Sequence, residues 1–401
     1  MQQILEITLS NKNIINHLKN NRLHIVSFDI PFPADYGGIM DVFYKVKTLF
    51  EAGFDITLHC FQYRERTPQV ELEKYCSKVY YYPRNMSPLK IFNIKPFIVN
   101  TRADKQLLKN LKKDPAPILF EGLHTCAFIH KRALKDHLKL IRMHNIEWEY
   151  YKDLVKSELS FWKKQYLKIE SWKLKRFEKE VLPFADKIFT ISPDDTDYFT
   201  EMVEKEDLTD SEVIYISPFH PNSFVESRTG TGHYVLFHGK LSISDNEKAA
   251  LYLIDRVFSK KEIPLSIAGK SPSERLIEKA KLFDHIKIIT NPDEATMNDL
   301  IQNAQINVLL SFQRAGMKLK LLNALYRGRH CIANGHMVQN TGLESLCYVK
   351  NTSKAIGATI ESLMNVQFSQ GQIAERREVL EQKFSNKENA AKIIAVLNNE
   401  V

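Results

Sequence analysis

Cysteine is scarce in this sequence, and its positions show no pattern of disulfide pairing or metal binding. The five cysteines are Cys60, Cys76, Cys126, Cys331 and Cys347. Their number is odd, they are widely separated, and no two of them form a C-x-x-C pair. This spacing excludes a disulfide framework and a cysteine-based zinc site, and it favours a reducing compartment.

The hydrophobic segments of secreted and integral membrane proteins are also missing. The opening residues, MQQILEI, lack the basic and then apolar layout of a signal peptide. No apolar run approaches the roughly 18 residues of a membrane span. We therefore expect a cytoplasmic protein that is not integral to a membrane.

Two common nucleotide-binding motifs are absent as well. No G-x-G-x-x-G follows the opening strand of either predicted domain, and G-x-x-x-x-G-K-[ST] occurs nowhere in the chain. Dinucleotide-binding and P-loop functions lose their main support, and we expect no cofactor.

Short apolar runs separated by helical patterns are present instead. The 401 residues, 44% hydrophobic and 26% charged, are an ordinary globular composition with the length of two domains. The first series of runs predicts strands at residues 23–28, 54–61, 79–82, 118–120, 140–143, 188–191 and 213–216. A second series predicts strands at residues 234–237, 265–268, 286–289, 306–310, 331–333 and 348–349. Strands that alternate with helices indicate parallel sheets.

An aperiodic cluster of proline, glycine, asparagine and serine at residues 218–232 predicts the domain boundary. Residues 1–217, opening on a polar helical lead-in over 1–20, form the first Rossmann-like domain, and residues 218–384 form the second. Residues 385–401 form a C-terminal helix that packs back toward the first domain. The predicted class is α/β, with two doubly wound domains facing a cleft where ligands bind.

One helical stretch concentrates the positive charge. The net charge is +8, and residues 160–176 carry six cations and a single acid, Glu170. The cations are Lys163, Lys164, Lys168, Lys173, Lys175 and Arg176. Apolar and aromatic residues recur among them at helical spacing: Trp162, Tyr166, Ile169 and Trp172. A solvated or core-packed helix and a helix lying on the inner membrane surface both fit this pattern.

Three segments have the composition of anion-binding turns. Gly37 and Gly38 precede a helix in PFPADYGG, where backbone N–H groups can approach an anion or a sugar, although a tight turn would look the same. After the first strand of the second domain, Gly239 allows close approach, Lys240 can reach a phosphate, and Asn246 follows at the next helix start.

The third segment places three cations around a helix N-terminus: Arg314, Lys318 and Lys320. Cations oppose the usual charge preference at this end of a helix, so an anion bound among them is the simplest explanation. A solvated cluster is the alternative. In contrast, the acids Asp194, Asp195 and Asp197 follow Ser192 and Pro193, which is the composition of a helix start, and we expect no metal site there.

Together these segments resemble the GT-B glycosyltransferases, especially the retaining, family-4-like group (glycosyl transferases group 1). The resemblance covers the opening strand with Gly37 and Gly38, the stretches 142–147 (RMHNIE) and 185–192, and Gly239 with Lys240. It is strongest at residues 316–328.

The resemblance implies a glycosyltransferase of polysaccharide biosynthesis that uses a nucleotide-sugar donor and a glycan or lipid-linked acceptor, with no nucleic acid partner. The resemblance also implies retention. Metal independence is expected, because fixed cations can neutralise the leaving diphosphate. The implied catalytic residues are His124, Lys240 and Lys320, although His124 also fits an ordinary core histidine. The implied donor-binding residues are Gly239, Lys240, Arg314, Gly316, Lys318, Lys320 and Asn323. The implied acceptor residues are Gly37, Gly38, His144, Asn145 and Glu147.

Two positions depart from the family pattern. Asn323 stands where the family commonly places an acid for the ribose hydroxyls, and Ala315 replaces an acid eight positions earlier. An asparagine loses the stronger, charge-assisted hydrogen bond. The sequence therefore leaves open a GT-B scaffold or binding protein without donor chemistry. A nucleotide-sugar epimerase is less well supported, since no set of acids stands out for proton transfer.

Overall fold

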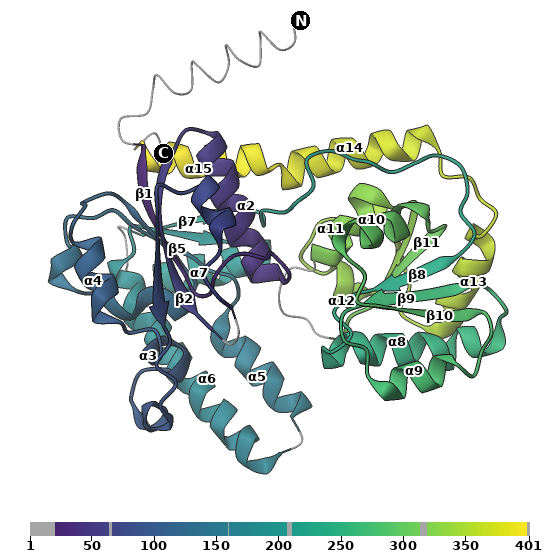
Figure 1. The fold of residues 1–401 in the computed structure, drawn as a ribbon, viewed down its shortest axis with the longest axis horizontal. Helices are drawn as coiled ribbons and strands as arrows, with labels where there is room; N and C mark the ends of the chain where they lie inside the picture. Colours follow the sequence, from purple (N-terminus) through teal and green to yellow (C-terminus); the bar gives the residue numbers. More distant parts are fainter. Residues whose placement is uncertain (1–20, 64–65, 159, 207–210, 313–318, 399–401) are drawn as a thin grey trace, which may run out of the picture. The chain divides into compact units, whose positions relative to one another are not determined.

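The computed structural model describes residues 21–63, 66–158, 160–206, 211–312 and 319–398. The chain divides into two units (Figure 1). Unit 1 comprises residues 1–221 and 384–401, and unit 2 comprises residues 222–383. The predicted helical lead-in, residues 1–20, lies outside the described residues.

Unit 1 is built on a parallel sheet with the strand order β3-β2-β1-β4-β5-β6-β7. Its strands are β1 (Arg22–Ser27), β2 (Asp55–Gln62), β3 (Lys78–Pro83), β4 (Ile118–Glu121), β5 (Lys139–Arg142), β6 (Lys187–Thr190) and β7 (Glu212–Tyr215). Its helices are α2 (Gly37–Glu51), α3 (Phe97–Asn100), α4 (Lys105–Leu111), α5 (Glu147–Ser157), α6 (Phe161–Val181), α7 (Pro193–Lys205) and α15 (Asn386–Leu397). Every strand predicted for this part of the sequence is present.

Helices cover both faces of this sheet. Successive strand residues point to opposite faces, and both sets are buried in apolar clusters. Ile25 of β1 belongs to one buried cluster, which includes Val42 of α2 and Ile393 of α15. The next residue, Val26, belongs to the other cluster, together with Phe177 of α6. The unbroken apolar character of the strands follows from this double coverage.

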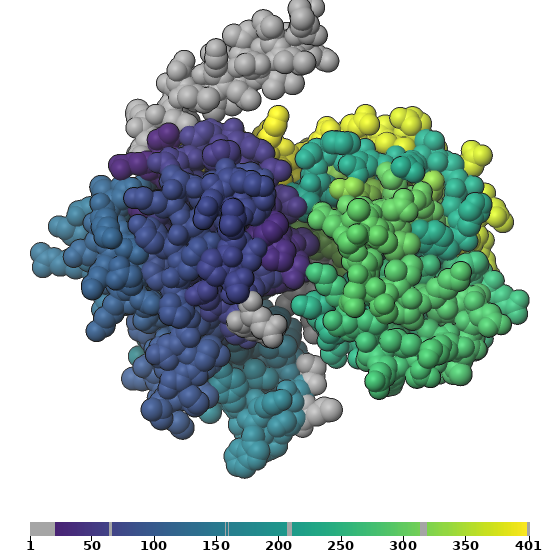
Figure 2. Space-filling model, viewed as in Figure 1, coloured from purple at the N-terminus to yellow at the C-terminus, as the bar shows by residue number. Residues whose placement is uncertain are grey.

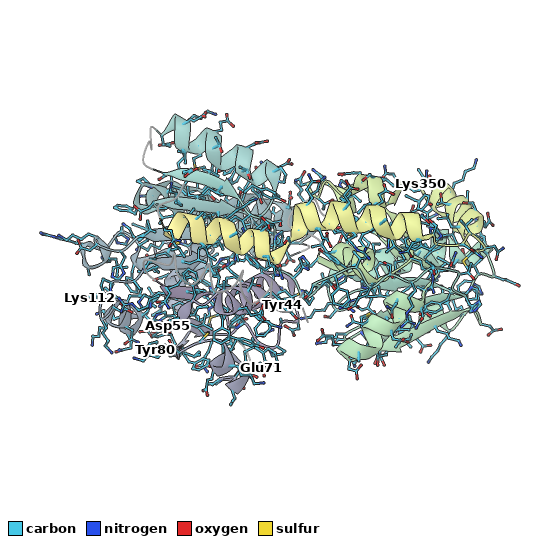
Figure 3. The ribbon with its side chains drawn as sticks, turned by 90° about the horizontal axis from the view of Figure 1, so that it is seen from above. Tyr44, Asp55, Glu71, Tyr80, Lys112 and Lys350 are labelled. Atoms are coloured by element: carbon cyan, nitrogen blue, oxygen red, sulfur yellow. The ribbon has the colours of Figure 1, made fainter. Side chains whose placement is uncertain are left out.

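The last helix of the chain packs on α2 within unit 1. Its N-cap is Ser385, whose hydroxyl accepts a hydrogen bond from the backbone N–H of Glu388, as the capping box predicts. Ala390 and Ile393 are buried in the cluster that Tyr44 of α2 borders. Figure 3 shows this yellow helix crossing unit 1 on the side of Tyr44.

The acids after β6 form a helix start, as predicted. The Ser192 hydroxyl accepts a hydrogen bond from the backbone N–H of Asp195 at 3.2 Å, and Pro193 is the first residue of α7. Acids in the first turn then lie at the positive end of the helix dipole.

Unit 2 contains the second parallel sheet, with the strand order β10-β9-β8-β11-β12-β13. Its strands are β8 (Val235–His238), β9 (Leu265–Gly269), β10 (Ile286–Thr290), β11 (Ile306–Leu309), β12 (His330–Ala333) and β13 (Tyr348–Val349). Its helices are α8 (Ser244–Arg256), α9 (Glu274–Ala280), α10 (Glu294–Asn303), α11 (Leu319–Arg327), α12 (Gly335–Val338), α13 (Ser353–Leu363) and α14 (Gln370–Phe384). Both sheets have the order of a doubly wound, Rossmann-like fold, which confirms the predicted class.

None of the helices in the described part of the chain is long and apolar enough to cross a membrane. The cytoplasmic location stays a prediction.

Candidate functional site

The strand order of unit 2 reverses between β8 and β11, and ligands of doubly wound sheets bind at the carboxyl ends of the strands on either side of such a point. β8 ends at His238, directly before Gly239 and Lys240, and β11 is followed by the segment that leads to Lys320. Gly239, Lys240 and Lys320 therefore lie at the carboxyl edge of the sheet, where ligands bind in such folds.

Two glycines bring the ends of β8 and β9 together. A Cβ atom at Gly269 would lie 1.8 Å from the carbonyl oxygen of Gly239. The N–H of Gly239 donates to the carbonyl of Ala268 at 3.1 Å, and its φ is 158°. A Cβ atom at Gly239 would also lie 3.1 Å from the side-chain amide of Asn246. The turn that carries Lys240 thus depends on glycine at both positions.

Asn246 links the Lys320 ammonium to the backbone of Lys240. The Lys320 ammonium donates to Asn246 Oδ1 at 2.8 Å and to the carbonyl of Leu310 at 3.4 Å. Asn246 Nδ2 in turn donates to the carbonyl of Lys240 at 3.0 Å. Lys320 also lies over the Phe237 ring, 5.3 Å from its centre. The half-buried Lys320 and the exposed Lys240 therefore lie on one connected surface at the starts of α8 and α11.

His238 is a member of this site that the sequence argument missed. Its side chain is buried, and its Nε2 has no hydrogen-bond partner among the described residues. Burial, and then the charge of Lys320, lower the pKa of His238 to about 3. The ring is therefore neutral at physiological pH. Its place at the end of β8, directly before Gly239, was the signal in the sequence.

The segment after β11 is anchored from two sides. The carboxylate of Asp245 in α8 accepts hydrogen bonds from the hydroxyl of Ser311 and the N–H of Phe312, both at 2.9 Å. Asn334, after β12, exchanges hydrogen bonds with the backbone of Ser311. The next residues include Arg314, Ala315, Gly316 and Lys318, which lie outside the described residues, so these predictions stay open.

Asn323 has a partner within unit 2. Its Oδ1 accepts a hydrogen bond from Asn222 Nδ2 at 2.9 Å. Asn222 Oδ1 accepts from Arg327 Nε at 3.1 Å, and Arg327 also forms an ion pair with Glu226. The amide oxygen of Asn323 is thus already engaged in a polar chain along α11. Its predicted contact with a ribose stays a prediction.

Unit 1 has a fully buried ionic network at the carboxyl ends of β4 and β5. Lys45 donates to Asp41 at 2.9 Å and to Glu121 at 2.7 Å. Arg142 makes two hydrogen bonds to Asp41, at 3.0 and 3.2 Å. Burial would raise the pKa of both carboxyls, but the neighbouring cations, Arg142 for Asp41 and Lys45 for Glu121, hold the pKa of each below its usual value. The network fastens α2 to the sheet.

His144 is held by the same network. Its Nε2 lies 2.8 Å from Glu121 Oε2, and its Nδ1 lies 4.0 Å from Asp41 Oδ2. Within the described chain, these three residues are also the group whose ligand atoms lie close enough together, within 4.8 Å, to hold a metal ion. The two carboxylates are already matched by the two cations, Lys45 and Arg142, so an added divalent cation would leave excess positive charge in a buried site. The residues fit a metal poorly.

His124 and Glu147 meet beside this network. His124 lies in a 3₁₀ segment, Leu123–Phe128, and Glu147 is the first residue of α5. His124 Nδ1 is 4.0 Å from Glu147 Oε1 and has no hydrogen-bond partner among the described residues. Burial raises the pKa of Glu147 to about 7, although Asn145 and Arg102 act in the opposite direction. Burial, and then the charge of Arg102, lower the pKa of His124 well below its usual value.

Gly37 and Gly38 form the first turn of α2, so the region predicted as a turn is already helical. The Phe28 ring packs against Gly38, where a Cβ atom would lie 2.9 Å from it. The same ring lies 5.4 Å from the His124 ring and 5.3 Å from the His144 ring, centre to centre. The structure thus brings Gly38, His124 and His144 together around Phe28, with Glu147 beside His124. Their predicted contact with an acceptor is not tested by this geometry.

The network residues Asp41, Lys45 and Glu121 were not predicted. Asp41 and Lys45 lie four residues apart on the apolar face of α2, among Ile39, Val42 and Val46. Charged residues at buried helical positions were the available signal. Arg102 could not be found from the sequence. Its buried guanidinium donates, among its described contacts, to backbone carbonyls, and such acceptors leave no pattern of side-chain types in the sequence.

Residues 232–365 match the family model described as Glycosyl transferases group 1, and this range contains Gly239, Lys240, Lys320 and Asn323. The chain is also 27% identical, over 338 residues, to a Klebsiella pneumoniae protein described as "Uncharacterized 44.6 kDa protein in cps region". That match covers 80% of this chain and 84% of the relative.

Several solved GT-B structures share the fold. HepE of Anabaena, in complex with UDP and glucose, has a TM-score of 0.63 at 9% identity, covering 95% of this chain and 100% of that chain. A TarM variant of S. aureus, in complex with Fondaparinux, alpha-GlcNAc-glycerol and UDP, has a TM-score of 0.65 at 10% identity, with coverages of 94% and 100%. A trehalose-6-phosphate synthase studied for glycosyl transfer with retention has a TM-score of 0.62 at 9% identity, with coverages of 95% and 99%. At these identities, the likeness shows the fold alone.

Proposed function

We propose that this chain, which has the GT-B fold, is a glycosyltransferase that moves a sugar from a nucleotide-sugar donor to a glycan or lipid-linked acceptor. The observation that carries this proposal is the connected surface of Lys240, Asn246 and Lys320 at the switch point of unit 2. It lies in the part of the chain that matches the family model.

This surface suits the diphosphate of the donor. Helices α8 and α11 both begin there, and the N–H groups of a helix start attract anions. Lys240 and Lys320 add two positive charges. As the bond between the sugar carbon and the diphosphate oxygen breaks, negative charge grows on that oxygen, and fixed cations stabilise it. His238 is buried and neutral, and its Nε2 has no hydrogen-bond partner in the described part of the chain, so we assign it a hydrogen bond to the ligand.

We assign the acceptor to unit 1, at Gly38, His124 and Glu147. A carboxyl with a pKa of about 7 beside a histidine 4.0 Å away can donate or accept a hydrogen bond at neutral pH. Such a pair can orient the attacking hydroxyl of a sugar. His144 is buried and bonded to Glu121, so we assign it a positioning role.

Retention and metal independence belong to the same proposal. Retention is the outcome named for the trehalose-6-phosphate synthase that shares the fold. The two lysines supply the positive charge that a metal provides in other transferases. A role in polysaccharide biosynthesis agrees with the relative in a cps region.

A scaffold protein without donor chemistry is the second candidate, and one observation favours it. The amide oxygen of Asn323 is engaged by Asn222, and no acid stands at that position for the ribose.

Binding of nucleoside diphosphates to the full chain distinguishes the two functions. A ligand that binds only the folded state raises the unfolding temperature, and the rise grows with the logarithm of one plus the ratio of free ligand concentration to Kd. We expect one of UDP, GDP, ADP or TDP to raise this temperature at a concentration of about 1 mM, a typical upper limit for a substrate KM. The chain should then transfer the sugar of the matching nucleotide sugar to an acceptor that is present in a cell extract. A chain that binds none of the four at this concentration has the scaffold function.

A further inference from the structure

Unit 1 exposes a cluster of large apolar side chains that its own core leaves uncovered. Phe92 is 85% exposed and Trp162 is 79% exposed. Further apolar members come from the same two segments of the chain, residues 86–94 and α6: Met86, Leu89, Ile91, Ile94, Phe161, Ile169 and Trp172. More than half of the exposed large apolar side chains in the described chain lie in these two segments. We call them the apolar surface of unit 1.

The two segments form one surface because buried contacts join them. Lys173 of α6 donates to the carbonyl of Ile91 at 2.7 Å. Glu170 of α6 accepts from the backbone N–H of Phe97 at 2.6 Å and pairs with Lys173 at 3.0 Å. Residues 86–97 are therefore fixed to the middle of α6. Figure 2 shows these blue and teal segments side by side at one end of unit 1.

Positive charges outnumber negative ones around this surface, although exposed Glu180 pairs with Arg176, and Asp153 of the neighbouring α5 pairs with Lys156. Residues 86–97 contain Lys90 and Lys95 and no acid. Within residues 160–176 the only acid is Glu170, and its carboxylate is buried and used by Lys173 and Phe97. Lys163, Lys168, Lys175 and Arg176 are exposed on α6. Ile169 and Trp172 lie among them at helical spacing.

We propose that the apolar surface of unit 1 binds the surface of a bilayer that contains anionic lipid. Tryptophan and phenylalanine suit the boundary between headgroups and acyl chains, and lysines beside them suit anionic headgroups. The proposal does not depend on the function assigned above, because no donor or acceptor takes part in this contact.

Tryptophan fluorescence provides a direct test with the full chain. The sequence has three tryptophans, and two of them, Trp162 and Trp172, lie on the apolar surface. The third, Trp148, donates its indole N–H to Tyr198 within unit 1. Vesicles of phosphatidylglycerol and phosphatidylcholine should shift the emission to shorter wavelength. Brominated acyl chains should quench it, and phosphatidylcholine alone should do so less.

Variants distinguish binding by this surface from non-specific adsorption to vesicles. Phe92→Ser combined with Trp162→Ser and Trp172→Ser should lower vesicle partitioning, measured by flotation, at least about tenfold. Lys163→Gln and Lys168→Gln should each lower it about fivefold at low salt. Val70→Ser and Leu282→Ser are matched controls, because both side chains are at least 70% exposed outside the surface. Unchanged thermal unfolding checks that each variant is folded.

Wild-type chain that fails to bind the anionic vesicles at low salt overturns the proposal. The proposal is also overturned if the triple variant at Phe92, Trp162 and Trp172 co-floats with the vesicles to the same extent as the control Val70→Ser. If a protein partner covers the surface instead, the vesicles will leave the emission unchanged.

Discussion

Replacing Lys45 with methionine should destabilise unit 1 more than any other single lysine substitution in α2. Lys45 is fully buried, and its ammonium is the group that joins Asp41 to Glu121. Methionine keeps most of the side-chain volume and removes the charge. Two carboxylates then remain in a buried site with Arg142 as the one full cation among the network residues.

The expected loss follows from the cost of an unpaired buried charge. Removing one partner of a buried pair typically costs about 3–5 kcal/mol. The stability of a whole domain is about 5–15 kcal/mol. We therefore expect Lys45→Met to lose a large share of the free energy of unfolding of unit 1.

Urea denaturation at pH 7, followed by circular dichroism, measures this loss. The control is Lys47→Met, because Lys47 is partly exposed and lies 3.9 Å from Glu51, a surface pair worth less than about 1 kcal/mol. The double variant Lys45→Met with Glu121→Gln removes one charge of each sign and should recover part of the stability. A loss below about 1 kcal/mol for Lys45→Met, or no recovery in the double variant, refutes the reasoning.

Acid titration checks the same network independently. Asp41 and Glu121 have folded-state pKa values below their usual values. Their contribution to stability is therefore complete above the unfolded pKa and is lost as the pH falls from there through the folded-state pKa. Lys45→Met removes the cation that lowers the pKa of Glu121, so its stability should fall less steeply with acid. If magnesium, manganese or zinc stabilises the wild type, the site is a metal site and the ionic account is wrong.

Three further predictions concern other parts of the molecule. Burial raises the pKa of Glu178 to about 8, so the folded state holds a proton that the unfolded state releases above about pH 4.5. The free energy of unfolding should therefore fall as the pH rises from about 4.5 to about 8. In urea denaturation at pH 8, Glu178→Gln should recover about 3–5 kcal/mol of it. An equal gain at pH 5 would disprove the assignment. Sugar transfer should continue in EDTA, and activity that EDTA abolishes and manganese restores would disprove metal independence. Asn323→Glu should tighten binding of a nucleoside diphosphate but not of its 2′,3′-dideoxy form, measured by calorimetry, and an equal gain for both would exclude a ribose contact.

Hydrophobic patterning was sufficient to predict the strands of both sheets, because buried parallel strands read as continuous apolar runs. The runs at 118–120 and 140–143, for example, became β4 and β5. The helix starts at Ser192 and Ser385 could also be predicted, and both serines are N-caps in the structure. These features depend on neighbours a few residues apart in the sequence.

The missing parts of the site depend on contacts between distant residues. Lys45 and Glu121 are 76 residues apart, and Lys320 and Asn246 are 74 residues apart. One sequence shows that Asp41 and Lys45 occupy an apolar helix face, but it does not show which strand supplies their partner. The sequence likewise did not show that the ring of Phe28 packs against Gly38. The contact of the glycine pair with an anion or a sugar stays a prediction.

The central claim, that unit 2 binds the donor diphosphate at the switch point, is tested most directly by calorimetry with Lys320→Ala. The titrants are the nucleoside diphosphate that the screen selects and the bare nucleoside. A charged hydrogen bond contributes about 1.5–3 kcal/mol, so the Kd for the diphosphate should rise roughly tenfold or more. The Kd for the nucleoside should not change. Lys281→Ala is the control, because this exposed lysine follows α9 at the opposite edge of the sheet. An equal loss for the diphosphate and the nucleoside would contradict the claim.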